Sequence, residues 1–110
     1  MSDLNLRGGT IVTAEGTFAA DVAVRGGRIA SVGATVPNDS AETVDVSGLL
    51  VMPGFIDAHT HMDMPFGGTI TADDWDSGTA AAVAGGTTTI VDFALQDAGQ
   101  TLGEAIETWQ

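Results

Sequence analysis

Two histidines, one residue apart, are the residues of this sequence best suited to chemistry. His59 and His61 lie in "GFIDAHTHMDMPFGGT", residues 54–69, at the end of an apolar run. Alternate residues of a strand point to the same face, so Asp57, His59 and His61 share one face. Two neutral imidazoles on a rigid strand can chelate one metal ion, and nitrogen ligands suit Zn²⁺ and its first-row neighbours. We therefore predict that His59 and His61 are metal ligands.

Asp57 is predicted to support this pair, because a carboxylate beside two imidazoles can orient a ring or raise its basicity. The alternative is that a His-x-His pair on a half-buried strand is only surface or satisfied core. The surroundings favour the metal interpretation: a Pro-Gly turn precedes the strand, and a later strand ends in Asp92. Two ligands alone do not make a tight site, so further ligands are needed.

The composition excludes several functions. Fifteen acidic residues face three arginines, for a formal net charge of −12, which argues against a nucleic-acid partner. An acidic, lysine-free surface fits a protein kept soluble at high salt, and a high-GC genome would give the same bias. The lack of cysteine excludes disulfides and thiolate metal sites and agrees with the cytoplasm. With no signal-peptide pattern and no apolar stretch of membrane-spanning length, we expect a cytoplasmic protein without a membrane partner.

Residues 1–52 are patterned as short strands with glycine turns. "LNLRGGTIV" (4–12) and "VAVRGGRIA" (22–30) both place Arg-Gly-Gly between apolar runs, which predicts two hairpins. Neither turn adjoins a helix N-terminus, so both are interpreted as structural and not as phosphate sites. The predicted strands are Leu4 to Leu6, Thr10 to Thr13, Asp21 to Arg25, Arg28 to Val32 and one more within "TVDVSGLLVMPG" (43–54).

Residues 53–110 are patterned as strand, helix, strand, helix, which predicts an α/β fold with a right-handed crossover. The first helix is expected in "TADDWDSGTAAAVAGG" (71–86), with Thr71 as N-cap and Asp74 completing a capping box. The strand "TTTIVDFA" (87–94) is β-branched and apolar, as in strands buried on both faces of a parallel sheet. One apolar stripe is predicted on each helix, and both tryptophans are interpreted as core anchors. The stripes are Trp75, Thr79, Ala82 and Val83, and Leu102, Ala105, Ile106 and Trp109.

A known family is similar to this sequence over its whole length. "GFIDAHTH" resembles the first-strand signature of cyclic amidohydrolases, and "MDMPFGGTITADDWDSGTAAAVAGGTTTIVDFA" resembles dihydropyrimidinases and D-hydantoinases. The resemblance implies a (β/α)₈ TIM-like barrel preceded by part of a small β-sandwich. Residues 1–52 would be the N-terminal part of that sandwich and 53–110 the first βαβα portion of the barrel. A full barrel needs roughly 250 residues, so we expect the chain to be an N-terminal fragment.

The resemblance also implies a site. His59 and His61 would bind the more buried of two metal ions, usually zinc, with other divalent metals possible. A bridging carbamylated lysine, two more histidines and a general-base aspartate would lie beyond residue 110, so no catalytic residue is expected within this chain. Met64 and Phe66 match apolar positions of a lid over the substrate, and the alternative for both is ordinary core packing.

The implied function is hydrolysis of a small cyclic amide, a dihydropyrimidine or a hydantoin, to an N-carbamoyl amino acid. The family is usually homotetrameric. Two alternatives stay open: an allantoinase-like cyclic amidohydrolase, since allantoinases share the histidine pair, and a non-catalytic scaffold protein of the same family. The chain of 110 residues by itself is expected to be inactive.

Overall fold

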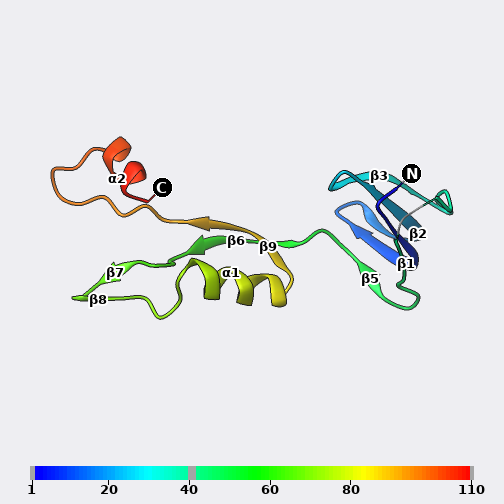
Figure 1. The fold of residues 1–110 in the computed structure, drawn as a ribbon, viewed down its shortest axis with the longest axis horizontal. Helices are drawn as coiled ribbons and strands as arrows, with labels where there is room; N and C mark the ends of the chain where they lie inside the picture. The colour runs from blue at the N-terminus through cyan, green and yellow to red at the C-terminus, as the bar shows by residue number, and fades with distance from the viewer. Residues whose placement is uncertain (1, 40–41, 110) are drawn as a thin grey trace. The chain divides into compact units, whose positions relative to one another are not determined.

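The computed structural model describes residues 2–39 and 42–109. The chain divides into two compact units, Met1–Pro53 and Gly54–Gln110, named here the first and the second unit. The first unit consists of strands, and the second alternates strands with helices (Figure 1). Within the described ranges, no helix is long and apolar enough to cross a membrane.

The first unit is one sheet built on a meander. Strands β1 (Leu4–Thr13), β2 (Gly16–Arg25) and β3 (Arg28–Gly33) are antiparallel, with β2 in the middle. The strands β4 (Glu42–Asp45) and β5 (Leu50–Val51) pair in parallel with the other edge of β1. The sequence prediction of one strand across residues 43–54 was therefore wrong, because a turn at residues 47 and 48 divides it. The buried core of the sheet is formed by Ile11, Ala20 and Val22.

The first Arg-Gly-Gly is a bulge inside β1 and not the predicted hairpin turn. The register of β1 against β2 shifts between Leu6 and Gly9. Gly8 has a φ of 77°, and its backbone N–H donates to Asp21 Oδ1 at 2.9 Å. Arg7 Nη1 lies 3.5 Å from Asp21 Oδ2. The carboxylate of Asp21, thirteen residues further along the chain, thus accepts a hydrogen bond from the backbone of the bulge. The turn between β1 and β2 forms later, at residues 14 and 15.

The second Arg-Gly-Gly makes the hairpin that its sequence predicts. Gly26 and Gly27 join β2 to β3 with φ values of 56° and 69°. Two successive positive φ angles are the mark of the mirror-image turn whose twist matches paired strands. The predicted strands on either side are therefore confirmed, although β2 begins five residues earlier than expected, at Gly16.

The second unit contains the predicted strand–helix–strand–helix order. The strands β6 (Phe55–Thr60) and β9 (Thr87–Asp92) pair in parallel, and α1 (Trp75–Ala84) forms the crossover between them. A small hairpin of β7 (Pro65–Phe66) and β8 (Thr69–Ile70) precedes α1, and α2 (Leu102–Thr108) follows β9. Figure 1 shows α1 running alongside β6 and β9. The expected α/β class, with a β unit first, is confirmed.

The N-cap of α1 is Asp74 and not Thr71, so this prediction was wrong. Asp74 Oδ1 accepts the Ser77 backbone N–H at 2.7 Å, and Ser77 Oγ accepts the Asp74 N–H at 3.1 Å. This reciprocal box satisfies two donors that a helix start otherwise leaves unpaired. The Thr71 hydroxyl is used elsewhere, because it accepts the Met64 backbone N–H at 3.0 Å at the base of the β7–β8 hairpin.

The α1 cap is expected to be sensitive to acid. The Ser77 backbone N–H, followed by the Ser77 side chain, lowers the pKa of Asp74 from its ordinary value of 3.8. A lowered folded-state pKa means that the stabilisation is present above the ordinary value and is lost as the pH falls through the lower one. We expect the Ser77 amide resonance to report loosening of the first turn below about pH 4.

Asp74→Asn tests this acid response, because asparagine caps a helix as well as aspartate but does not titrate. The Ser77 amide of that variant should show a much smaller change in the same pH range. Asp76→Asn, two residues further along in the first turn of α1, is the control and should keep the wild-type response. An unchanged acid transition in Asp74→Asn would assign the response to another group.

The apolar side chains of the second unit are less covered than the sequence pattern predicts. Within this chain, Trp75 is 40% exposed, Val83 63% and Val91 49%. The buried position of α1 is Gly78, which packs on Met62. In the part of the chain that is described, Gly78 of α1 therefore lies against Met62, which follows β6.

Candidate metal centre

The two histidines converge at the C-terminal end of β6. His59 lies within the strand and His61 directly follows it, so both side chains leave the backbone on one face. Their Nε2 atoms are 3.1 Å apart, and the ring planes are inclined at 80° with centroids 5.0 Å apart. Both rings are exposed. The pair therefore presents two nitrogen atoms to one point outside the strand.

The separation of these nitrogens fits a metal ligand pair. A tetrahedral zinc ion with nitrogen ligands at about 2.0–2.1 Å holds them roughly 3.3 Å apart, close to the 3.1 Å found here. The same distance is also that of a hydrogen bond, in which one neutral imidazole donates and the other accepts. The donor type and the spacing thus suit a divalent transition metal without any movement of the backbone.

Phe93 contacts both imidazoles and was missed by the sequence analysis. Its ring centroid lies 4.5 Å from that of His59 and 5.4 Å from that of His61. Phe93 directly follows β9, and the pairing of Thr60 with Asp92 brings the two strand ends together. Phe93 can be assigned to the site only when the parallel register of β6 against β9 is known. Its ring thus packs against both imidazoles.

Asp57 holds the backbone beside His59. Asp57 Oδ1 accepts the His59 backbone N–H at 3.1 Å. Asp57 and His61 both line a cavity of about 330 Å³ that also borders Met62 and Gly78. The carboxylate therefore steadies the strand segment that carries His59, while its action on an imidazole ring stays a prediction.

The lid candidates lie on the β7–β8 hairpin, which begins soon after the histidine pair. Gly67 and Gly68 form its turn with φ values of 59° and 83°. Phe66 is 73% exposed at the tip, whereas Met64 is half-buried at the base, where its carbonyl accepts the Thr71 N–H at 2.9 Å. Within this chain, Phe66 is not packed in a core. The hairpin presents it to solvent.

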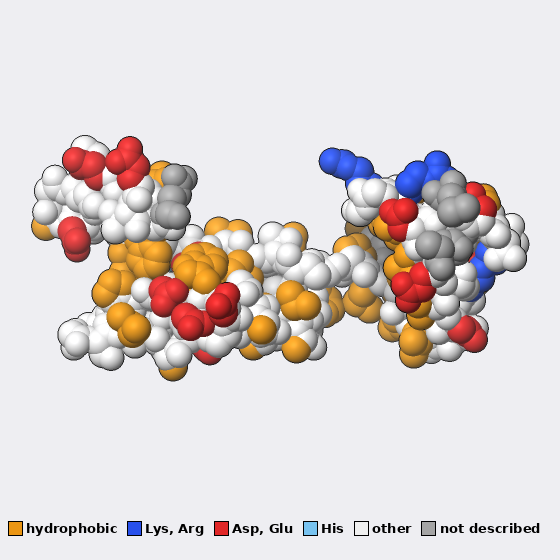
Figure 2. Space-filling view, viewed as in Figure 1, with side chains coloured by type: hydrophobic (Ala, Val, Ile, Leu, Met, Phe, Trp, Pro, Cys, Tyr) orange, Lys and Arg blue, Asp and Glu red, His pale blue; other side chains and the backbone are white. Residues whose placement is uncertain are grey.

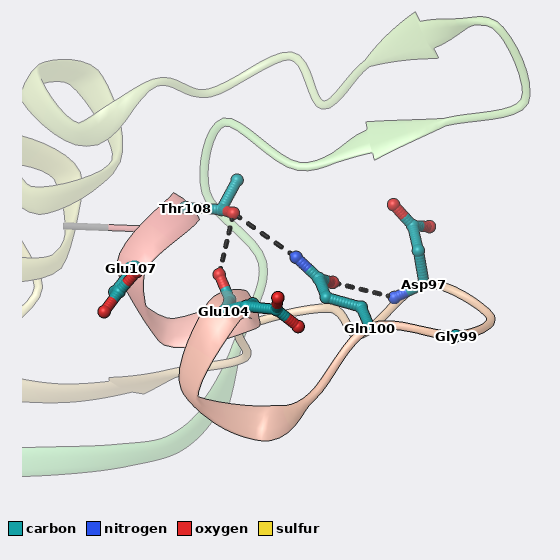
Figure 3. A pocket seen from close by; sticks show the side chains of 6 residues that line it. All are labelled: Asp97, Gly99, Gln100, Glu104, Glu107 and Thr108. Atoms are coloured by element: carbon teal, nitrogen blue, oxygen red, sulfur yellow. Dashed lines mark hydrogen bonds between the residues drawn. The ribbon is translucent and has the colours of Figure 1, made fainter.

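Acidic side chains elsewhere do not form a rival metal site. An open depression of about 630 Å³ beside α2 is bordered by Asp97, Glu104 and Glu107. Figure 3 shows how these side chains lie. Gln100 bridges this loop, since its Oε1 accepts the Asp97 N–H at 3.0 Å and its Nε2 donates to Thr108 Oγ1 at 3.4 Å. Over residues 2–39 and 42–109, no three His, Cys, Asp or Glu side chains gather closely enough to hold a metal ion.

The formal charges of the second unit are all of one sign, negative. All three cationic side chains, Arg7, Arg25 and Arg28, belong to the first unit, and residues 54–110 contain neither lysine nor arginine. On the face seen in Figure 2, acidic side chains are visible on both units, whereas the basic ones lie only on the first. The histidine pair therefore stands in a segment whose formal charges are all negative, which favours a cation.

Known proteins resemble this chain closely in sequence. It is 53% identical over 104 residues to a D-hydantoinase of Geobacillus stearothermophilus, covering 94% of this chain and 22% of that protein. It is 45% identical over 112 residues to a dihydropyrimidinase of Rattus norvegicus, covering 97% of this chain and 22% of that one. The chain thus spans less than a quarter of the length of these relatives.

Solved structures resemble it equally well. A crystal structure of D-hydantoinase from Bacillus sp. AR9 matches with a TM-score of 0.92 and 52% identity, over 97% of this chain and 23% of that one. A dihydropyrimidinase from Brevibacillus agri NCHU1002 matches with a TM-score of 0.92 and 48% identity, over 99% and 23%. The model of the amidohydrolase family matches residues 42–108, which include both histidines. The chain belongs to the amidohydrolase family.

Proposed function

We propose that the protein carrying this chain is a metal-dependent hydrolase that opens dihydropyrimidine or hydantoin rings to N-carbamoyl amino acids. The 3.1 Å approach of His59 Nε2 to His61 Nε2 is the observation that carries this proposal. The similarity to proteins named D-hydantoinase and dihydropyrimidinase supports the choice of substrate class. The reaction would be hydrolysis of a cyclic amide C–N bond.

His59 and His61 would hold one divalent ion, which we propose to be zinc in a binuclear site whose other ligands come from outside residues 1–110. The chemistry that such ions supply is polarisation of the scissile carbonyl and a lowered pKa for water. The two imidazoles would bind through Nε2 and would not transfer protons there, because coordination would occupy the lone pair of each Nε2 atom. Phe93 would keep the two rings in the orientation that binding needs.

The β7–β8 hairpin would cover the substituent of the substrate ring. Phe66 supplies an exposed apolar surface near the tip, and the two glycines of the turn let the hairpin adapt to groups of different size. Met64 would act closer to the base. The chain would thus contribute one half of the metal site and part of the wall that selects the substrate.

The whole protein would combine a barrel with a β-sandwich. The elements β6, α1, β9 and α2 would be the first part of a (β/α)₈ barrel, and the sheet of the first unit would belong to a β-sandwich. The assembly would be a homotetramer in the cytoplasm. Neither nucleic acid nor a membrane is a proposed partner.

Assays of the protein that carries this chain on dihydrouracil, phenylhydantoin and allantoin test the function. We expect N-carbamoyl products from the first two, with kcat/KM exceeding that for allantoin by at least about tenfold. A preference for allantoin would overturn the substrate assignment in favour of an allantoinase. No turnover of any of the three by protein with metal at the histidine pair would favour a scaffold protein and contradict the proposal.

A further inference from the structure

One oxygen of Asp92 bonds to the residues on both sides of His61. Thr60 Oγ1 donates to Asp92 Oδ1 at 2.9 Å, and the Met62 backbone N–H donates to the same oxygen at 3.2 Å. The Thr60 hydroxyl also lies 3.2 Å from the Val91 carbonyl. Because β6 ends at Thr60, His61 itself is outside the strand ladder. The carboxylate therefore replaces the ladder at the point where the second imidazole leaves the backbone.

Met62 is held from its other side by α1. Its side chain is only 7% exposed and fills the space left by the missing side chain of Gly78. A Cβ on Gly78 would lie 2.9 Å from Met62 Sδ and 3.0 Å from its Cε. The backbone around His61 is thus fixed by Asp92 of β9 and, through Met62, by the helix.

The second carboxylate oxygen of Asp92 adds no hydrogen bond to the fold among the described residues. Asp92 Oδ2 is buried and has no hydrogen-bond partner among the described residues. A buried oxygen without a partner is unfavourable, because it has lost its water. A carboxylate kept in this position suggests that its other oxygen is needed. The neighbouring Phe93 lies against both imidazoles, so movement of Asp92 would also move that ring.

We infer that Asp92 is a positioning residue that sets the direction of the His61 imidazole relative to His59 by clamping Thr60 and Met62. It touches neither ring. Its action is to fix the backbone from which His61 projects and, through Phe93, to limit how far the two rings turn. This inference rests on the metal-binding role proposed for the histidine pair.

Three variants of the protein test the clamp: Asp92→Ala removes the acceptor, Asp92→Asn retains an acceptor oxygen, and Thr60→Val removes one donor while keeping the shape. Asp97→Asn is the charge-matched control, because Asp97 is an exposed loop carboxylate. The readouts are the Zn²⁺ affinity, measured by titration well below the unfolding temperature, and the imidazole nitrogen resonances of His59 and His61 in metal-free protein. A purely structural role would lower the melting temperature without moving either readout.

We expect Asp92→Ala to weaken Zn²⁺ binding by about tenfold and to shift the His61 ring resonances more than those of His59. Asp92→Asn should restore the affinity to within about threefold of wild type, and Thr60→Val should fall between these variants. The control should match the wild type. A folded Asp92→Ala with wild-type affinity and wild-type His61 resonances would overturn the inference; if that variant does not fold, the same result for Thr60→Val overturns it.

Failure of the proposed function would look different. His61→Ala belongs in the same titration, and equal Zn²⁺ affinity of His61→Ala and wild type would show that the pair is no metal site. The resonances of metal-free Asp92→Ala would then still decide the clamp. Shifted His61 signals would support it, and unchanged signals would contradict it.

Discussion

His59→Ala is expected to abolish metal binding at the site and with it the hydrolytic activity. The two Nε2 atoms, 3.1 Å apart, would bind one ion together, so the variant would lose one of the two imidazole ligands that this chain supplies. Loss of groups that merely orient metal ligands costs about 10–100-fold in affinity, and loss of a ligand itself should exceed that range. Metal content per protomer and kcat for ring opening are the measurements.

His61→Ala and the double variant provide the matched comparison. Because the two residues act as a unit, the double variant should be no worse than either single one, which is strong non-additivity. Circular dichroism must show the wild-type fold in each variant, since Phe93 loses a packing partner when either ring is removed. Retention of normal metal content and turnover by His59→Ala would sink the metal assignment.

The second large effect is expected from Gly54→Ala. A Cβ on Gly54 would lie 2.7 Å from Thr88 Cβ and would contact Thr88 Oγ1 and Cγ2 even more closely. Thr88 is β-branched and stiff, so it cannot turn away as a long side chain would. Relief requires that the start of β6 move from β9, where the Phe55 N–H now donates to the Gly86 carbonyl at 2.9 Å. Overpacking of this kind costs about 3 kcal/mol.

Chemical denaturation of Gly54→Ala and two comparison variants measures this effect. Gly103→Ala is the control, because the nearest atom to its new Cβ, Thr101 Oγ1, is 4.0 Å away. It should be neutral or stabilising by about 0.4–1 kcal/mol. Adding Thr88→Gly to Gly54→Ala should recover part of the lost stability, because it removes all three contacting atoms. A Gly54→Ala protein within about 0.5 kcal/mol of wild type would contradict the close approach.

The two Arg-Gly-Gly motifs show what local sequence determines and what it does not. The second forms a hairpin because Gly26 and Gly27 can both adopt positive φ and nothing distant competes. The first has the same three residues, yet Asp21 accepts its Gly8 N–H and β1 continues. The difference comes from pairing with β2 and β4, which no short window of sequence contains.

The start of α1 also could not be determined from the local sequence. Thr71 and Asp74 are both good N-cap residues, so local preference could not choose between them. Thr71 is not the N-cap because its hydroxyl accepts the Met64 N–H at the base of the β7–β8 hairpin. Periodicity placed both helices and both parallel strands correctly, because those signals are local.

Only the part of the site formed by residues close together in the sequence could be predicted. The alternation of β6 brings His59 and His61 to one face, and this follows from spacing alone. Phe93 and Asp92 come to the pair through the register of β9 against β6, in which Thr60 faces Asp92. That register depends on packing along the whole crossover, including the contact of Gly78 with Met62. Residues 32 positions apart, as Thr60 and Asp92 are, could not be matched without it.

The confinement of all three arginines to residues 1–53 has a kinetic consequence. With no lysine or arginine in residues 54–110, the formal charges that this segment places around the histidine pair are all negative, and they attract small cations before any contact is made. Such a field raises the local concentration of ions of opposite sign and speeds their encounter, and it weakens as ionic strength rises. Capture of a divalent ion at His59 and His61 would thus be fastest in dilute buffer, whatever the final affinity.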